Sequence, residues 1–375
     1  METSLILQSE FWQDGSVWIA QAHADADGRS LAEYAAEHLR MKDACFFQTS
    51  GTEGTRKWVG LTKEALITSA RAVNTHFGIT ADDHWLLALP VYHVGGFGIL
   101  ARSVASGSKV TQYEGKWDAA VFVEKCAEAG ATLASLVPTQ VFDLVAAGLR
   151  APGTMRVVLV GGGALNPELE QAALDLGWPV RRTYGMTETA SGVAAQREAG
   201  GGMEVLPIWK VSTSAEGVLS VSGPALAKGY AIQEGGVWRW EEIPASGMRT
   251  RDRVEVWQNA AGATCLRFLG RESGIVKILG ELVALEPIQD RIEALKLQLG
   301  LGGADAAVCD VPDGRKESQL VLAVSGTCVS DSAILQTSLN NLLRPLEHIH
   351  DVRHVPAIPR SELGKVKLAE LRGLL

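Results

Sequence analysis

The sequence predicts an α/β protein with helices over a mostly parallel sheet, a small β-barrel-like unit and a smaller C-terminal α+β domain. Its composition, 46% hydrophobic and 21% charged over 375 residues, is typical of a folded protein with a large buried core. Between residues 63 and 184, helical patterns alternate with short apolar runs, which is typical of a parallel sheet covered by helices. From about residue 200 to 270, β-prone segments punctuated by glycine indicate the antiparallel or barrel-like unit.

The elements of the parallel region follow from capping signals and apolar runs. Asn166 and Pro167 suit the N-cap and the first position of a helix over residues 167–176. Short apolar runs bounded by turn signals predict strands that are buried on both faces. The other expected helices span residues 63–76, 118–129 and 139–148, and the expected strands span residues 84–90, 132–137, 157–160 and 180–183.

After Gly270 the β-prone pattern gives way to a mixed pattern of strands and helices. A strand is expected over residues 275–279, followed by a helix over residues 287–299 whose apolar stripe runs from Ile288 to Leu299. We therefore expect a first domain over residues 1–270 and a second, α+β domain over residues 271–375. The β-prone segments of the preceding unit are residues 217–222, 237–240, 253–257 and 265–269.

The charge balance argues against two classes of partner. With a formal net charge of −8, the chain lacks the basic field that attracts nucleic-acid backbones or anionic lipid. No stretch approaches the ~20 apolar residues of a membrane span, and residues 1–10 lack the basic and apolar regions of a secretory signal. We therefore expect a cytoplasmic protein with small-molecule partners, and the sequence leaves a homo-oligomer open.

The fold class itself predicts where a ligand binds. In open α/β sheets, ligands bind beyond the carboxyl ends of the strands, where loops and helix N-termini converge. That rule gathers His93, residues 95–96, residues 138–140, residues 161–163 and residues 184–188 at one rim. The last segment places a hydroxyl beside a carboxylate, which suits phosphate oxygens and a divalent cation.

A second candidate phosphate site precedes the first expected helix of this region. Residues 49–57 form a turn rich in glycine and hydroxyl side chains that ends in Lys57. Glycines let amides approach phosphates closely, hydroxyls donate hydrogen bonds, and lysine neutralises charge. The loop lacks the Gly-Lys-Ser/Thr spacing of a Walker motif, and residues 161–166 do not fit the dinucleotide fingerprint.

Eight segments, taken in chain order, resemble the successive core motifs of AMP-forming acyl-CoA synthetases. Any one of them is a weak signal, but eight in the family's order are very specific. Within that superfamily, residues 89–96, 133–140 and 250–253 are most similar to the 2-succinylbenzoate–CoA ligases of menaquinone synthesis. The eight segments are residues 49–57, 89–93, 161–165, 184–188, 250–252, 270–271, 277–281 and 359–365.

The resemblance implies a two-step reaction with ATP, CoA and Mg²⁺. ATP and a carboxylic acid give an acyl-adenylate and pyrophosphate, and the CoA thiol then displaces AMP to form a thioester. By resemblance, Glu188 binds magnesium and Thr187 contacts phosphate, while Asp252 and Arg271 lie at the ribose. Lys365 bridges the acyl carboxylate and the α-phosphate, so the second domain must close over the first and later move to admit CoA.

The resemblance also implies the remaining ligand contacts, and it counts His93 among the reacting residues as well as in the acyl pocket. The phosphate loop contributes Thr49, Ser50, Gly51, Thr52, Gly54 and Lys57; the other ATP or AMP contacts are Gly161, Gly162, Gly163, Ala164, Tyr184, Gly185 and Met186, with the 161–165 turn and Tyr184 beside the adenine; the acyl pocket contains His93, Gly95, Gly96 and Thr139.

The chain departs from the family pattern in several places. Glu53 puts a carboxylate in the phosphate loop, where Arg56 replaces the usual proline and offers compensation, and Ser273 stands where the hinge usually has aspartate. Only 48 residues precede Thr49, so we expect a shortened N-terminal subdomain. The acyl-pocket segments contain no arginine except Arg102, a turn or more along the following helix, so we expect a modestly polar pocket.

Two alternatives to a 2-succinylbenzoate ligase stay open. One is a CoA ligase for another aryl or medium-chain acid, and the other is a non-catalytic nucleotide- or acyl-binding relic. Taken singly, the motif residues have ordinary structural explanations, such as a solvated turn for residues 49–57. The joint retention of Lys365, Glu188 and Asp252, three charged groups far apart in sequence, favours the enzyme.

Overall fold

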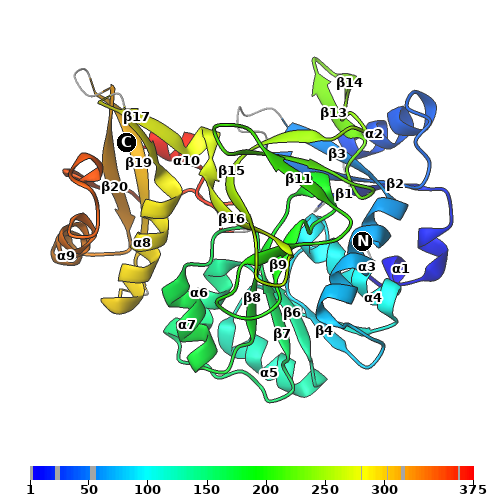
Figure 1. The fold of residues 1–375 in the computed structure, drawn as a ribbon, viewed down its shortest axis with the longest axis horizontal. Helices are drawn as coiled ribbons and strands as arrows, with labels where there is room; N and C mark the ends of the chain where they lie inside the picture. Colours follow the sequence, from blue (N-terminus) through cyan, green and yellow to red (C-terminus); the bar gives the residue numbers. More distant parts are fainter. Residues whose placement is uncertain are drawn as a thin grey trace.

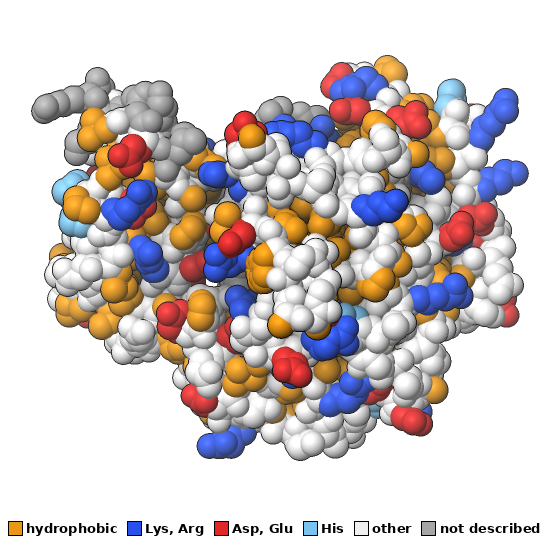
Figure 2. Space-filling model, in the orientation of Figure 1, with side chains coloured by type: hydrophobic (Ala, Val, Ile, Leu, Met, Phe, Trp, Pro, Cys, Tyr) orange, Lys and Arg blue, Asp and Glu red, His pale blue; other side chains and the backbone are white. Residues whose placement is uncertain are grey.

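Three regions are visible in Figure 1: a sheet covered by helices α5, α6 and α7 at the bottom, a strand-rich region above it, and a C-terminal region at the left. Figure 2 shows Lys and Arg side chains interspersed with Asp and Glu over the same face. Within the described ranges, no helix is long and apolar enough to cross a membrane. The computed structural model describes residues 3–21, 26–50, 56–279, 281–301, 303–313, 317–361 and 364–375.

Five parallel strands form one part of the largest sheet, in the order β5-β4-β6-β7-β8. Every residue of β6 and β7 is buried, as the continuous apolar runs predict. The predicted cap is confirmed, because Asn166 Oδ1 accepts a hydrogen bond from the Leu169 amide. The strands are β4 (His84–Leu87), β5 (Lys109–Gln112), β6 (Leu133–Leu136), β7 (Val157–Val160) and β8 (Val180–Tyr184). The helices are α3 (Lys63–Phe77), α4 (Val94–Ser106), α5 (Ala119–Ala129), α6 (Pro138–Ala146) and α7 (Pro167–Asp175).

The antiparallel unit continues the same sheet. Strand β8 pairs antiparallel with β9, so the 11-stranded sheet changes from parallel to antiparallel at that point. The predicted α/β class is therefore confirmed, with the parallel and antiparallel parts joined edge to edge. The added strands are β9 (Ala194–Gln196), β10 (Met203–Val205), β11 (Lys210–Thr213), β12 (Val218–Ser222), β15 (Met248–Gln258) and β16 (Thr264–Arg271).

A separate five-stranded sheet has the order β1-β2-β3-β13-β14. The segment expected over residues 237–240 belongs here rather than with its sequence neighbours, because hairpin β13–β14 pairs with β3. Such pairing is a long-range choice that local β propensity does not encode. The elements are β1 (Val17–Ala20), α2 (Ala26–Glu37), β2 (Ala44–Ser50), β3 (Arg56–Thr62), β13 (Gly229–Glu234) and β14 (Val237–Glu242).

The first described residues are anchored to the core by a buried lysine. Helices α1 (Thr3–Ile6) and η1 (Ser9–Trp12) lead into β1. Lys63 Nζ donates to Asp14 Oδ1 at 2.5 Å and to the Phe11 carbonyl, and it also lies over the Phe11 ring. The Phe11 ring packs against Phe97 of α4, with centroids 6.3 Å apart. A short segment thus covers one face of the aromatic core.

The C-terminal region has its own core and a three-stranded sheet of order β19-β20-β21. Helix α8 (Leu285–Gln298) packs there through Ile288, Ile292 and Leu295, whereas Leu299 lies past its end and is 37% exposed. The predicted stripe is therefore one residue too long. The other elements are η3 (Glu272–Gly274), β17 (Ile275–Ile278), β18 (Glu281–Ala284), β19 (Asp305–Asp313), β20 (Glu317–Ser325), α9 (Val329–Asn340), η4 (Pro345–Glu347), β21 (Asp351–His354) and α10 (Leu368–Arg372).

Candidate active site

A buried carboxylate, Asp252, is the centre of the site. It lies on β15 opposite Arg271, the last residue of β16, and near Tyr184, the last residue of β8. Arg271 Nε donates to Asp252 Oδ1 and Tyr184 Oη donates to Oδ2, both at 2.8 Å. Burial opposes the charged guanidinium, but the Asp252 pair raises the pKa of Arg271 overall. Burial and then the Asp252 charge raise the pKa of Tyr184. These two hydrogen bonds hold the Asp252 carboxylate in one orientation.

The turn that follows β8 presents Thr187 and Glu188 beside this carboxylate. A Cβ on Gly185 would lie 1.5 Å from the Ser191 carbonyl oxygen, so only glycine permits this close return of the chain. Ser191 has a φ of 91°, a left-handed conformation that is uncommon for a residue with a side chain. Strained turns of this kind concentrate at functional sites. Both Thr187 and Glu188 are half-buried.

The phosphate-loop residues that the structure describes lie on the paired strands β2 and β3. Thr49 and Lys57 are opposite each other, and Thr49 Oγ1 donates to the Lys57 carbonyl at 3.3 Å. Lys57 Nζ lies 3.7 Å from Glu241 Oε2. Ser50 ends β2. The predicted residues Gly51, Thr52 and Gly54, and Glu53 with them, lie outside the described residues, as do the side chains of Ser50, Arg56 and Ser273.

The predicted acyl-pocket and adenine residues follow neighbouring strands. His93 is the N-cap residue of α4, so Gly95 and Gly96 lie in its first turn. Thr139 lies in the first turn of α6, which follows β6. Residues 161–164 follow β7, and all but the first of them are exposed. Because β4, β6, β7 and β8 are parallel, these segments share one edge of the sheet.

The C-terminal motif reaches the same edge from the other region. A Cβ on Gly364 would lie 2.7 Å from Thr139 Oγ1, so the Gly364 backbone packs directly against the Thr139 side chain. Arg360 holds the motif by donating to the Gly364 carbonyl at 2.8 Å. Partial desolvation, followed by repulsion from Arg271, lowers the pKa of Lys365, although its side chain keeps an exposed surface. Attraction from Glu286, Asp252 and Glu188 opposes that shift.

The structure therefore brings together residues that are up to about 180 positions apart, from Tyr184 and Glu188 to Asp252, Arg271 and Lys365. Comparison with known proteins identifies the family of the chain. The pattern of the family described as "AMP-binding enzyme" matches residues 2–231, which is more than half of the chain. This chain belongs to the AMP-binding enzyme family.

Curated relatives share part of their length with this chain. A 2-succinylbenzoate–CoA ligase of Bacillus licheniformis is 31% identical over 214 residues, 53% of this chain and 45% of the relative. A protein of the same name from Enterococcus faecalis is 35% identical over 156 residues, 40% of this chain and 32% of the relative. The chain thus spans less than half the length of these relatives.

Solved structures extend the likeness to the C-terminal region. MenE of E. coli, a variant solved with bound OSB-AMS, has a TM-score of 0.69 and 25% identity over 88% of this chain and 68% of that one. The o-succinylbenzoate CoA synthetase (MenE) of Bacillus subtilis, in complex with the acyl-adenylate OSB-AMP, has a TM-score of 0.74. It covers 99% of this chain and 81% of that one at 21% identity, so this second match supports the fold alone.

Arg102 is a buried charged side chain that contacts the turn after β8, and the sequence did not predict its burial. It is 5% exposed, its Nη2 donates to Ser191 Oγ at 3.0 Å, and its guanidinium carbon lies 5.9 Å from the Trp85 ring centroid. Arg102 Nε and Trp85 Nε1 are both buried without a hydrogen-bond partner. In the part of the chain that the structure describes, no carboxylate pairs with Arg102. The signal in the sequence is an arginine inside an otherwise apolar helix.

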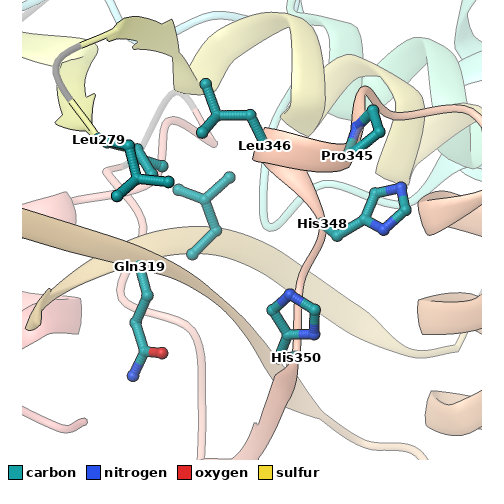
Figure 3. Close-up of a pocket in the computed structure, with 8 residues that line it drawn as sticks. Leu279, Gln319, Pro345, Leu346, His348 and His350 are labelled. Carbon is teal, nitrogen blue, oxygen red and sulfur yellow. The ribbon is translucent and has the colours of Figure 1, made fainter. Parts of the chain in front are cut away.

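A separate pocket lies in the C-terminal region. Figure 3 shows Leu279 and Leu346 on one side of it and Gln319, His348 and His350 on the other. None of the residues predicted for the site lines this pocket, so it does not belong to the cluster around Asp252.

Proposed function

We propose that the chain is an AMP-forming ligase that joins a carboxylic acid, 2-succinylbenzoate, to CoA with consumption of ATP. The observation that carries this proposal is the position of the C-terminal motif: Gly364 lies against the Thr139 side chain at the edge of the sheet, and Lys365 is the next residue. Lys365 brings a positive charge from the C-terminal region toward the carboxylates of Glu188 and Asp252. That charge stabilises a polyanionic nucleotide that binds at the same place.

In this proposal, the nucleoside binds along the edge of the sheet beyond β7 and β8. Asp252 accepts hydrogen bonds from the ribose hydroxyls through lone pairs that Tyr184 and Arg271 leave available. The exposed residues 162–164 and the Tyr184 ring flank the adenine. Since Arg271 and Tyr184 already fix both oxygens of Asp252, the acceptor is pre-organised before ATP binds.

The donor set near the phosphates fits magnesium. Glu188 and Thr187 offer carboxylate and hydroxyl oxygens, and Mg²⁺ usually binds through one or two carboxylates together with substrate phosphates. Across the described ranges, no group of three or more His, Cys, Asp or Glu side chains forms a metal cage. When bound, the cation neutralises the charge on the triphosphate. Lys57 of β3 adds a second positive charge to the same end of the nucleotide.

Lys365 acts in the first half-reaction. A carboxylate oxygen of the acid attacks the α-phosphorus, the bond from that phosphorus to the bridging oxygen breaks, and pyrophosphate leaves with the electron pair. Negative charge is then concentrated between the acyl carboxylate and the α-phosphate, where the ammonium of Lys365 stabilises it. Burial, followed by repulsion from Arg271, lowers the pKa of Lys365, and attraction from Glu286, Asp252 and Glu188 opposes that shift.

The second half-reaction requires a different arrangement. The CoA thiol loses its proton and attacks the acyl carbon, the carbon–oxygen bond to the phosphate breaks, and AMP leaves. Gly364 lies against Thr139, so the segment with Gly364 and Lys365 occupies the space through which we expect the CoA thiol to reach the acyl carbon. We infer that residues 271–375 move away as a unit between the two steps, with the segment around Ser273 as the hinge.

Arg102 supports the choice of acid. 2-Succinylbenzoate carries two carboxylates, so one must stay bound while the other reacts. A buried arginine with an unpaired Nε suits that second carboxylate, because a buried donor without a partner costs about 1–3 kcal/mol. Burial lowers the pKa of Arg102 to about 10, so the guanidinium is still charged at neutral pH. An acid without a distal carboxylate would leave this cation uncompensated.

Pyrophosphate release with a panel of acids tests the proposal. We expect 2-succinylbenzoate to be adenylated at least about 100-fold more efficiently than benzoate, hexanoate or octanoate, because those acids leave a buried donor unpaired. Replacing the buried arginine (Arg102→Met) should abolish most of that preference, whereas Arg150→Met, at an exposed arginine, should preserve it. A preference for octanoate would refute the choice of acid, and no release with any acid would refute the ligase.

A further inference from the structure

Tyr230 is a residue of β13 that none of the sequence motifs singles out, yet it touches the site directly. Its hydroxyl donates to Glu188 Oε1 at 3.1 Å and lies 3.5 Å from Met248 Sδ. A backbone hydrogen bond also links the segment before β13 to Glu188, because the Ala227 amide donates to the Glu188 carbonyl at 2.8 Å. The five-stranded sheet and the turn after β8 are therefore joined at Glu188.

The ring of Tyr230 also contacts the phosphate-loop lysine. Lys57 Nζ lies over that ring, 5.3 Å from its centroid, which is within the range of a cation–π interaction. The strand register explains the contact: Tyr230 is opposite Val59 and Ile232 is opposite Lys57. Residues two apart on β3 share a face, so Lys57 is the diagonal neighbour of Tyr230 on that face.

One side chain thus restrains both groups that face the triphosphate. The hydroxyl occupies one oxygen of Glu188 and leaves Oε2 available, while the ring limits where the Lys57 ammonium goes. We propose that Tyr230 is a positioning residue, which presents Glu188 Oε2 to the divalent cation and Lys57 to the phosphates at a fixed separation. This inference rests on the proposed function, since it takes the triphosphate site as given.

Two substitutions separate the two contacts. Tyr230→Phe keeps the ring and removes the hydroxyl, whereas Tyr230→Leu removes both. Tyr113→Phe is the matched control, because the Tyr113 hydroxyl donates to the Lys116 carbonyl just after β5, the edge strand of the 11-stranded sheet, whereas β13 belongs to the five-stranded sheet. The measurement is Mn²⁺ binding, followed by electron paramagnetic resonance, with the full chain and a non-hydrolysable ATP analogue. Thermal unfolding of each variant reports whether it folds.

We expect Tyr230→Phe to weaken Mn²⁺ binding about tenfold, the loss typical of a hydrogen bond to a charged group, and to leave affinity for metal-free nucleotide unchanged. Tyr230→Leu should weaken both, since Lys57 then loses the ring contact and keeps only its ion pair with Glu241. In a Glu188→Gln background, Tyr230→Phe should cause no further loss of Mn²⁺ affinity, which a general structural defect would not reproduce.

Several results would overturn the inference. Wild-type Mn²⁺ affinity in Tyr230→Phe would do so, as would a loss that adds in full to that of Glu188→Gln. If Tyr230→Phe unfolds at a much lower temperature than Tyr113→Phe and the wild type, Tyr230 is a packing residue and the proposal is wrong. Metal–nucleotide binding by the wild type without turnover would refute the proposed function, while these binding comparisons would still decide the role of Tyr230.

Discussion

Gly364 allows a test of the closed arrangement, in which the C-terminal region contacts Thr139. The substitution leaves every proposed catalytic group in place. In the Gly364→Ala variant, the new Cβ would lie 2.7 Å from Thr139 Oγ1 and 2.8 Å from Thr139 Cγ2. The φ of Gly364 is +75°, so alanine there also costs about 1–2 kcal/mol of backbone strain. That strain lies within the C-terminal turn and is present whether or not the turn contacts Thr139. Only the overlap with Thr139 is specific to the closed arrangement.

The size of the effect follows from the overlap. Overpacking a well-packed contact costs about 1–3 kcal/mol, which corresponds to a roughly 5- to 150-fold slower step. We therefore expect Gly364→Ala to slow adenylation by that factor and to leave conversion of a chemically supplied acyl-adenylate to thioester unchanged. Gly148→Ala is the control for strain alone, because Gly148 has a φ of +63° and no atom within 4 Å of its Cβ position.

Two rates are measured for each variant, and a second substitution tests the origin of the effect. Pyrophosphate release reports the first half-reaction, and thioester formation from the supplied acyl-adenylate reports the second. Thr139→Ala removes the atoms that the new Cβ meets, so the Thr139→Ala/Gly364→Ala double variant should recover most of the adenylation that Gly364→Ala loses relative to Thr139→Ala alone. Equal slowing of both half-reactions, or no recovery in the double variant, would refute the closed arrangement as the adenylating one.

Three other predictions concern charged groups. Lys365→Ala should lose acyl-adenylate formation by several orders of magnitude yet still convert a supplied acyl-adenylate; equal loss in both assays would contradict an alternating C-terminal region. Glu188→Gln should slow pyrophosphate release strongly without a change in circular dichroism, and a parental rate would rule out its metal role. Burial, followed by repulsion from Glu286, Glu293 and Glu168, raises the pKa of Asp290 from 3.8 to about 7. Between those pH values the folded protein keeps a proton that the unfolded chain has lost, so the free energy of unfolding falls as pH rises. Asp290→Asn should therefore raise the melting temperature more at pH 8 than at pH 4, and an equal shift at both would show that Asp290 titrates normally.

The parts of the fold that the sequence predicted well are those decided by local chemistry. The strand Val157–Val160 has the predicted bounds, because four consecutive apolar residues are bounded by turn residues on each side. Helix α3 ends one residue beyond its predicted end, where Gly78 adopts the left-handed conformation of a C-cap. In both cases the deciding interactions involve residues within a few positions of the element.

The parts that the sequence did not predict depend on contacts between distant residues. Hairpin β13–β14 pairs with β3 rather than with its neighbours in the chain, and this pairing places Tyr230 beside Glu188. The burial of Arg102 depends on packing between Trp85 and Ser191, which lie on different elements. The motifs did include Tyr184 and Arg271, the two residues that hydrogen-bond to Asp252 in the structure. They did not predict the groups that orient those residues.

Product analysis of the wild-type chain tests most directly the claim that it catalyses both half-reactions. The chain is incubated with Mg²⁺, ATP, 2-succinylbenzoate and CoA, and the products are identified by mass spectrometry. The account predicts AMP, pyrophosphate and 2-succinylbenzoyl-CoA in equal amounts, and acyl-adenylate without free thioester when CoA is left out. Bound ATP that is recovered intact, with neither AMP nor thioester formed, would contradict the account and identify the chain as a nucleotide-binding protein.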